Sequence, residues 1–366
     1  MARPAFVVFS LLLFAIPLEA AWILKKNTYV VDIDMSRQER LGQTVILKCD
    51  TTEEQINTNI HWEKKSNHHK PNSESWVKVG HGTELRVHVK DFPDAGNYTC
   101  RNQKREVLHY IVLLINEIVD VRGTNSKQIL KEHPGTKKFI NCEAKTYSGD
   151  FTCSWQIPKE GHEEMFVLQA EGGLRNVNCS HPALDPDRSV YTTNCQELGV
   201  CLHGEESQRV ALVLHAIRGK RYENATTAFF IRNIVKPDPP QNLSISPSTE
   251  RSIVLHWHYP ESWNTQHTFF PLTFKVKVEE TGKTQRKNTH NHQSGRRKRS
   301  KERAQYYDVE GTSLTLEQWN AGKTYCVQAR DRYGASSWSD WSTCKHSMHQ
   351  EKPRRLKSSL ASKGTW

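Results

Sequence analysis

The stretch Trp338-Ser339-Asp340-Trp341-Ser342 decides the fold of this 366-residue chain. Two tryptophans three residues apart do not fit the two-residue alternation of a β-strand. They fit a stack in which each ring lies against cationic side chains of a neighbouring strand, and such a strand is expected at 326–332. On that strand Gln328, Arg330 and Arg332 share one face. Cation–π contacts of this kind are worth roughly 0.5–2 kcal/mol each, so the pattern predicts a stiffened β domain.

The N-terminal third carries a second decisive pattern. Cys49 ends an alternating run at 44–49, Trp62 follows, and Asp94-Ala95-Gly96-Asn97-Tyr98-Thr99-Cys100 completes the set. In immunoglobulin-like domains two cysteines join the sheets, a tryptophan packs on the disulfide, and a tyrosine two residues before the second cysteine forms a corner. The pattern therefore predicts such a domain with a Cys49–Cys100 disulfide.

Two more strand-rich modules follow. Cys142 and Cys153, with Trp155 just after, fit a disulfide that links two neighbouring strands. The proline-rich stretch 236–240 predicts a short, stiff linker. Beyond it, strands are expected at 253–259 and 274–280, with Cys326 and Cys344 as the remaining pair. No segment shows a convincing helical period, so the fold is predicted as all-β, with three tandem β-sandwiches. The expected parts are a signal peptide at 1–20, domains at 21–116, 117–236 and 237–345, and a polar basic tail at 346–366.

The N-terminus predicts a secreted, extracellular protein. Arg3, the apolar stretch 6–16 and the small residue Ala20 form the pattern of a cleavable signal. No second apolar span follows Cys344, so no membrane insertion is expected. Nine cysteines in a secreted chain imply disulfides and one cysteine left over. A net charge of +11 then favours an acidic partner or acidic glycans over nucleic acid.

No pattern predicts an enzyme. The 18 histidines include no His-Glu-x-x-His, and Gly80-x-Gly82 stands alone in a turn between strand-like runs. Scattered surface histidines explain the composition better than a metal site does. We therefore expect no catalytic residues, no cofactor and no metal.

Trp-Ser-x-Trp-Ser resembles the signature of the membrane-proximal fibronectin type III domain in class I cytokine receptors. Other stretches resemble, more closely, the receptor-like beta-subunit family of the heterodimeric cytokines interleukin-12 and interleukin-23. They are 21–26 (AWILKK), 142–149 (CEAKTYSG), 222–224 (YEN), 229–240 (FFIRNIVKPDPP) and 330–333 (RDRY). The resemblance implies a secreted subunit of a cytokine that acts in immune signalling. It also implies a cytokine-receptor homology region of two fibronectin-III-like modules, a Cys179–Cys195 disulfide and C-mannosylation of Trp338.

Two partners follow from the resemblance. The first is a four-helix-bundle alpha subunit, held at the bend between the second and third modules. Its implied contacts are Tyr147, Glu205, Phe269, Asp331 and Tyr333. Aromatic side chains would anchor it, and Asp331 would pair with an arginine on a partner helix.

The second partner is a receptor chain like interleukin-12 receptor beta-1. It would bind the immunoglobulin-like domain, with Asp91 and Phe92 as candidate contacts. An ordinary turn at these two residues is the alternative.

Cys201 separates two interpretations of the whole chain. Pairing the other eight cysteines leaves it alone, near Glu205 and Glu206. By the resemblance it forms an interchain disulfide with the alpha subunit; a capped or buried thiol is the alternative. A soluble decoy receptor, the competing function, has no use for a reserved thiol.

Two kinds of surface site complete the predictions. N-glycosylation sequons occur at Asn97, Asn224, Asn242 and Asn178, the last with Cys179 as its middle residue. A basic run could bind heparan sulfate, could be cleaved after Arg299, or could be a solvated loop. We favour glycan binding, because clustered cations attract polyanions without exact geometry. Its members are Arg296, Arg297, Lys298, Arg299, Lys301 and Arg303.

Overall fold

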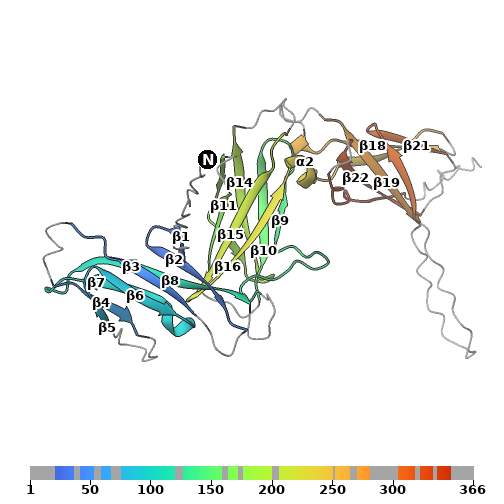
Figure 1. The fold of residues 1–366 in the computed structure, drawn as a ribbon. Coiled ribbons are helices and arrows are strands. Elements are labelled where there is room, and N and C mark those ends of the chain that lie inside the picture. Colours follow the sequence, from blue (N-terminus) through green and yellow to red (C-terminus); the bar gives the residue numbers. More distant parts are fainter. Residues whose placement is uncertain are drawn as a thin grey trace, which may run out of the picture.

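The computed structural model is almost entirely β, and its strands fall into three successive groups along an extended molecule (Figure 1). This confirms the predicted fold class. The residues that the structure describes are 21–36, 42–52, 59–66, 76–119, 127–158, 164–171, 176–199, 206–249, 252–263, 270–280, 304–317, 322–332 and 336–347.

The first module is the predicted immunoglobulin-like sandwich. Its Cys49–Cys100 disulfide spans a Cα–Cα distance of 6.1 Å, and Trp62 is fully buried in the same core. The Tyr98 hydroxyl donates to the Asp94 carbonyl at 2.5 Å, which forms the expected tyrosine corner. Its elements are β1 (Ala21–Lys25), β2 (Thr28–Asp34), β3 (Gln43–Lys48), β4 (His61–Lys65), β5 (Trp76–His81), β6 (Glu84–Val89), the 3-10 turn η1 (Phe92–Asp94), β7 (Gly96–Arg101) and β8 (Val107–Val119).

The second module pairs two sheets around the fully buried Trp155. One sheet has the order β11-β15-β16, and the other has the order β12-β14-β10-β9 with β13 added to β14. The elements are β9 (Ile140–Glu143), β10 (Asp150–Gln156), β11 (Glu164–Ala170), β12 (Asn176–Cys179), β13 (Ala183–Asp185), β14 (Val190–Leu198), β15 (Val210–Arg218), β16 (Arg221–Phe229) and the one-turn helix α2 (Ile231–Ile234).

The third module has a three-stranded sheet, β17-β18-β21, and a four-stranded sheet, β20-β19-β22-β23. Trp257 and Phe274 fill its core, with ring centroids 5.6 Å apart. The strands expected at 253–259 and 274–280 are found as β18 and β19. The elements are β17 (Gln241–Pro247), β18 (Ser252–His258), η2 (Glu261–Trp263), β19 (Leu272–Glu280), β20 (Gln305–Val309), β21 (Ser313–Glu317), β22 (Lys323–Asp331) and β23 (Lys345–His346).

The first two modules share one continuous sheet, which the sequence did not predict. The long strand β8 pairs in parallel with β16 through Ile115–Arg221 and Asn116–Tyr222. Tyr222 is fully buried beside this pairing, in a cluster with Val30 and Leu114. A sheet that continues across the boundary leaves little freedom between the two modules.

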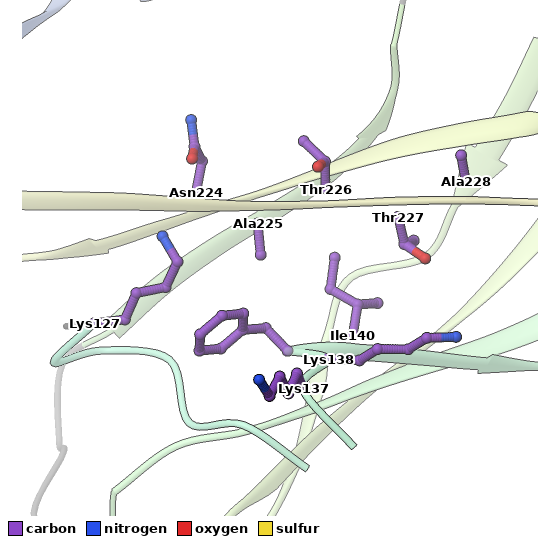
Figure 2. A pocket seen from close by; sticks show the side chains of 10 residues that line it. Lys127, Lys137, Lys138, Ile140, Asn224, Ala225, Thr226, Thr227 and Ala228 are labelled. Atoms are coloured by element: carbon purple, nitrogen blue, oxygen red, sulfur yellow. The ribbon is translucent and has the colours of Figure 1, made fainter. Parts of the chain in front are cut away.

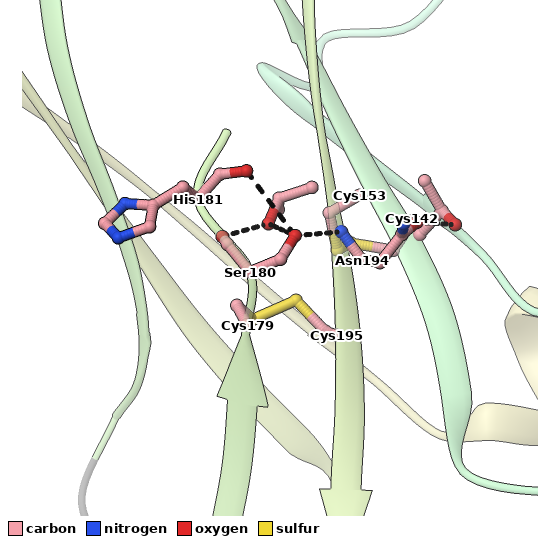
Figure 3. Close-up of a disulfide and its surroundings, with 9 residues drawn as sticks. Cys142, Cys153, Cys179, Ser180, His181, Asn194 and Cys195 are labelled. Atoms are coloured by element: carbon pink, nitrogen blue, oxygen red, sulfur yellow. Dashed lines mark hydrogen bonds between the residues drawn. A yellow bond between two sulfur atoms is a disulfide. The ribbon is translucent and has the colours of Figure 1, made fainter. Parts of the chain in front are cut away.

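Among the described residues, four disulfides join the same cysteine pairs that were expected. Cys142–Cys153 and Cys179–Cys195 each link residues directly opposite one another on neighbouring antiparallel strands (Figure 3). Their Cα–Cα distances are 4.1 and 4.0 Å. The fourth pair, Cys326–Cys344, ties β22 to the segment that follows the tryptophan motif.

The serines of that motif bond to the edge of β22. The Ser339 and Ser342 hydroxyls accept the backbone N–H groups of Ala329 and Val327 at 2.8 and 3.0 Å. The backbone N–H groups of the same serines donate to the carbonyls of the same two residues, each at 2.7 Å. The motif therefore covers an edge that would otherwise present unpaired backbone groups.

The cations of the stack come mainly from another strand than predicted. The Arg330 guanidinium lies 4.5 Å from the Trp338 ring centre, as expected. Lys275 and Lys277 of β19 supply the other cations, 4.5 and 5.0 Å from Trp338 and Trp341. The expectation for Arg332 is wrong, because its guanidinium contacts Glu310 instead.

Candidate functional site

The bend between the second and third modules is held by contacts on both sides of the linker. The Ser337 N–H donates to the Val235 carbonyl at 3.0 Å. Lys236 pairs with Asp340 of the tryptophan motif at 3.2 Å, and Lys145 of the second module pairs with Asp238 at 3.1 Å. The linker is thus fixed against both neighbours, which makes the elbow a defined surface.

One hydrogen bond crosses the elbow at its centre. The Tyr147 hydroxyl, from the second module, donates to the carboxylate of Asp331 at the end of β22. The Tyr147 ring packs edge-on against Phe270 and Trp263, with centroids 4.9 and 6.1 Å apart. Tyr147 and Asp331 are two of the predicted contact residues, and the structure brings them together.

Asp331 lies beneath the surface of the free chain. It is only 1% exposed, and its backbone N–H donates to the Ser336 hydroxyl at 3.3 Å. Burial, together with the bond to Asp331, raises the pKa of the Tyr147 phenol far above its usual value. Tyr147 therefore remains a donor at all physiological pH values. In the free chain the Asp331 carboxylate is bonded to Tyr147, and its pairing with a partner arginine stays a prediction.

A second cluster supports the same region. The Glu206 carboxylate accepts the backbone N–H groups of Ile231 and Arg232 at 2.7 and 3.1 Å, at the start of α2. The Arg232 guanidinium then stacks 4.0 Å from the Phe230 ring centre, and that of Arg209 lies 5.5 Å from it. Glu206 thus orders the chain between β16 and the linker.

The exposed part of the elbow is aromatic. Phe270 remains 37% exposed beside the half-buried Tyr147. Phe270, Trp263 and Glu206 were not among the predicted site residues. Their signal was faint: Phe270 follows another phenylalanine, and Glu206 follows another glutamate. The predicted residues Cys201, Glu205, Phe269 and Tyr333 lie outside the described residues.

The predicted receptor contacts lie at the joint between the first two modules. Asp91 caps the turn η1 by accepting the Phe92 N–H at 2.7 Å. The Arg221 guanidinium of the second module stacks 4.4 Å from the Phe92 ring centre. Lys220 donates to the Phe92 carbonyl at 3.0 Å. The turn therefore has a structural role in the joint, and both residues remain partly exposed.

The other predicted sites divide into described and undescribed ones. Asn97, Asn178 and Asn242 are exposed, Asn224 is half-buried, and Trp338 is partly exposed between Lys275 and Arg330. The basic run at 296–303 and the segment 1–20 lie outside the described residues. Within the described ranges, no helix is long and apolar enough to cross a membrane. The described part of the chain also holds no group of acidic, histidine or cysteine side chains that could bind a metal.

Comparison with known proteins gives concordant matches over almost the whole chain. Residues 40–110 match the immunoglobulin domain family, and residues 137–218 match the family described as cytokine interleukin-12p40 C-terminus. Interleukin-12 subunit beta of Lama glama is 38% identical over 349 residues, which cover 92% of this chain and 96% of that protein. The chain belongs to the interleukin-12 subunit beta family.

Other relatives agree. The Ovis aries protein is 37% identical over 348 residues, covering 92% of this chain and 96% of its own length. The Marmota monax protein is 38% identical over 346 residues, with 91% and 95% covered. A chain of a solved cytokine receptor complex aligns at 12% identity and a TM-score of 0.35, covering 58% of this chain and 98% of that one. Membership of this family makes the chain a cytokine beta subunit and not an enzyme, and it does not favour the decoy receptor.

Proposed function

We propose that the chain is secreted and pairs through its elbow with a four-helix-bundle alpha subunit, giving a heterodimeric cytokine of the interleukin-12 or interleukin-23 type. The observation that carries this proposal is the aromatic surface at a fixed bend, where Phe270 stays exposed beside Tyr147. Rigid scaffolds that present loops are well suited to recognition, and buried aromatic anchors dominate the energy of many interfaces.

Asp331 has a role in each state of the proposed assembly. In the free chain its carboxylate accepts the Tyr147 hydroxyl and so positions that ring. In the heterodimer an arginine of the partner helix reaches the same carboxylate and shares it with Tyr147. The arginine adds a further charge-assisted bond to this carboxylate, and such bonds are about twice as strong as neutral ones.

In this proposal Cys201 links the two subunits of the heterodimer by a disulfide. It follows β14 and precedes Glu206, whose carboxylate holds the start of α2 at the elbow. A disulfide from this part of the sequence would reach a partner seated on the aromatic surface.

The first module then engages the cell-surface receptor chain, of the interleukin-12 receptor beta-1 type. Because the elbow is occupied by the alpha subunit, a separate surface has to reach the cell. The η1 turn, with Asp91 and Phe92, is the proposed centre of that surface. The basic run at 296–303 is proposed to hold heparan sulfate near the cell.

Co-expression with an interleukin-12-type alpha subunit tests the elbow, in a Cys201→Ser background so that assembly is non-covalent. Asp331→Ala removes both the Tyr147 bond and the carboxylate offered to the partner, whereas Tyr147→Phe removes only the bond. We expect Asp331→Ala to weaken assembly by about 2–5 kcal/mol, clearly more than Tyr147→Phe does. Equal effects of the two variants would assign Asp331 a purely internal role, and wild-type assembly by both would refute the elbow site.

A further inference from the structure

A cationic cavity lies in the second module, lined by none of the residues that form the elbow contacts. It measures about 460 Å³ and lies between strand β16 and the segment that leads into β9 (Figure 2). Its ten lining residues, all in the described part of the chain, include three lysines and no acidic side chain. They are Lys127, Lys137, Lys138, Phe139, Ile140, Asn224, Ala225, Thr226, Thr227 and Ala228.

The lining shows that the cavity opens onto the edge of β16. Five consecutive residues, 224–228, border it. Successive strand side chains point to opposite faces of a sheet, so a cavity bordered by five in a row has to touch the backbone between them. β15 occupies one edge of β16 along its whole length, and β8 occupies the other edge only at Arg221 and Tyr222. In the described residues, no other strand pairs with the rest of that edge.

The hydrogen-bond pattern identifies which backbone groups are presented. On the β8 side, the Ile115 N–H donates to the Lys220 carbonyl at 2.9 Å. Because strands repeat every two residues, the N–H and C=O groups of Asn224, Thr226 and Ala228 point to the same edge. That edge therefore offers alternating donors and acceptors to an added strand.

The side chains that line the cavity carry positive charge only, and the nearest acidic group, Glu223, attracts Lys127 from beside it. Lys127 lies 5.5 Å from the Phe139 ring centre, and Figure 2 shows Lys127 and Lys138 toward opposite ends with Ile140 between them. The neighbouring Glu223 is buried and already accepts the N–H groups of Gln128, Ile129 and Leu130 at 2.6–3.1 Å. Its carboxylate is thus engaged in holding the start of the module.

We propose that the free edge of β16 binds an extended acidic peptide segment of a partner protein, which adds as a strand while its carboxylates meet Lys127, Lys137 and Lys138. Strand addition supplies affinity through main-chain hydrogen bonds, and side-chain pockets supply specificity. A sulfated glycan fits less well, because it lacks the regular alternation of donors and acceptors with which an extended peptide backbone matches a strand edge.

The sequon at Asn224 lies on this edge, so a glycan there could regulate peptide binding. Its threonine, Thr226, is exposed, and its backbone N–H is one of the proposed donors. A glycan on Asn224 would stand beside the cavity and hinder strand addition, in the way that proteins protect free edges. Binding of the peptide to this edge would then depend on whether Asn224 carries a glycan.

Two variants at Thr226 distinguish the contribution of its backbone N–H from the effect of a glycan on Asn224. Thr226→Ala removes the sequon and keeps the N–H, whereas Thr226→Pro removes both, and proline is tolerated on an edge strand. The probe is a short soluble peptide that alternates Glu with Thr, measured by calorimetry against the full secreted chain. We expect saturable binding to the Thr226→Ala chain and roughly fivefold weaker binding to the Thr226→Pro chain, because one hydrogen bond is lost.

Charge is tested in the Thr226→Ala background. Replacing Lys127, Lys137 and Lys138 together with Ser should weaken binding roughly tenfold. The control replaces the exposed Lys78, Lys104 and Lys345 with Ser, changes the net charge equally, and should leave binding unchanged.

Three outcomes would overturn the proposal. They are equal binding by the Thr226→Pro and Thr226→Ala chains, equal losses from the two lysine triples, and lysine-dependent binding of a heparin oligosaccharide without binding of the peptide. Should Thr226→Pro fail to fold, the probe N-methylated at alternate amides provides the same test, because it should lose binding to the Thr226→Ala chain.

Discussion

Tyr147→Phe is the most informative single change, because it removes one hydroxyl at the centre of the elbow. The ring would keep its contacts with Phe270 and Trp263, at centroid distances of 4.9 and 6.1 Å. The lost bond is the one to the Asp331 carboxylate, which is 1% exposed and would remain buried without it. The change therefore isolates a charge-assisted hydrogen bond between two modules.

The expected cost follows from the environment of that carboxylate. Hydrogen bonds to charged groups contribute about 1.5–3 kcal/mol to stability. With a urea dependence of about 2 kcal/mol/M, the midpoint of the affected transition should fall by roughly 1 M. Tryptophan fluorescence is a suitable probe, because Trp263 lies against the Tyr147 ring.

A double-mutant cycle with Asp331→Ala measures the pair itself. Tyr259→Phe is the matched control, since Tyr259 packs edge-on against Phe274 at 5.3 Å within the third module and not across the elbow. A coupling energy near zero between Tyr147 and Asp331, or an equal loss of stability in Tyr259→Phe, would show that this hydrogen bond does not hold the two modules together.

Four further changes have defined outcomes. Cys201→Ser should convert a covalent heterodimer into one that separates on a non-reducing gel, and an unchanged dimer band would exclude the interchain bond. Phe92→Ala should weaken receptor binding more than Arg221→Ala does, measured by surface plasmon resonance, and equal losses would mean that the turn only supports the module joint. Replacing the five cations from Arg296 to Lys301 with Ser should lower the salt that elutes the chain from heparin while assembly stays normal; a purified chain that starts at Ser300 would instead indicate cleavage. Burial lowers the pKa of His215 below 6.5, so between the two pKa values the unfolded chain binds a proton that the folded chain does not bind. Stability should therefore fall as pH drops below about 6.5, and His215→Gln should flatten that slope in thermal unfolding.

Local patterns predicted much of the fold. The Cys49–Cys100 disulfide, Trp62 and Tyr98 each occupy a place that a short motif specifies, and the structure has all of them there. The tryptophan motif likewise predicted a stack on β22. It did not reveal that lysines of β19 supply most of the cations, because that depends on which strand lies beside β22.

Contacts between modules could not be predicted from the sequence. Tyr147 and Asp331 stand 184 residues apart, and Arg221 and Glu117 stand 104 apart. Their meeting depends on how whole modules are joined, and no local spacing encodes it. The same reason explains why Phe92 was predicted as a receptor contact or as part of an ordinary turn, and not as a partner of Arg221, whose guanidinium stacks on its ring. Family resemblance pointed to Tyr147 and Asp331, but the burial of Asp331 came from the structure.

Hydrogen exchange on the secreted heterodimer, compared with the free beta chain, would locate the surface that holds the alpha subunit. We expect slower exchange in the complex for the backbone amides around Tyr147, at 206–210, at 230–236 and at the end of β22. The first module, including η1, should exchange equally in both samples. Protection confined to the first module, with an unchanged elbow, would contradict the claim that this chain holds its partner at the bend.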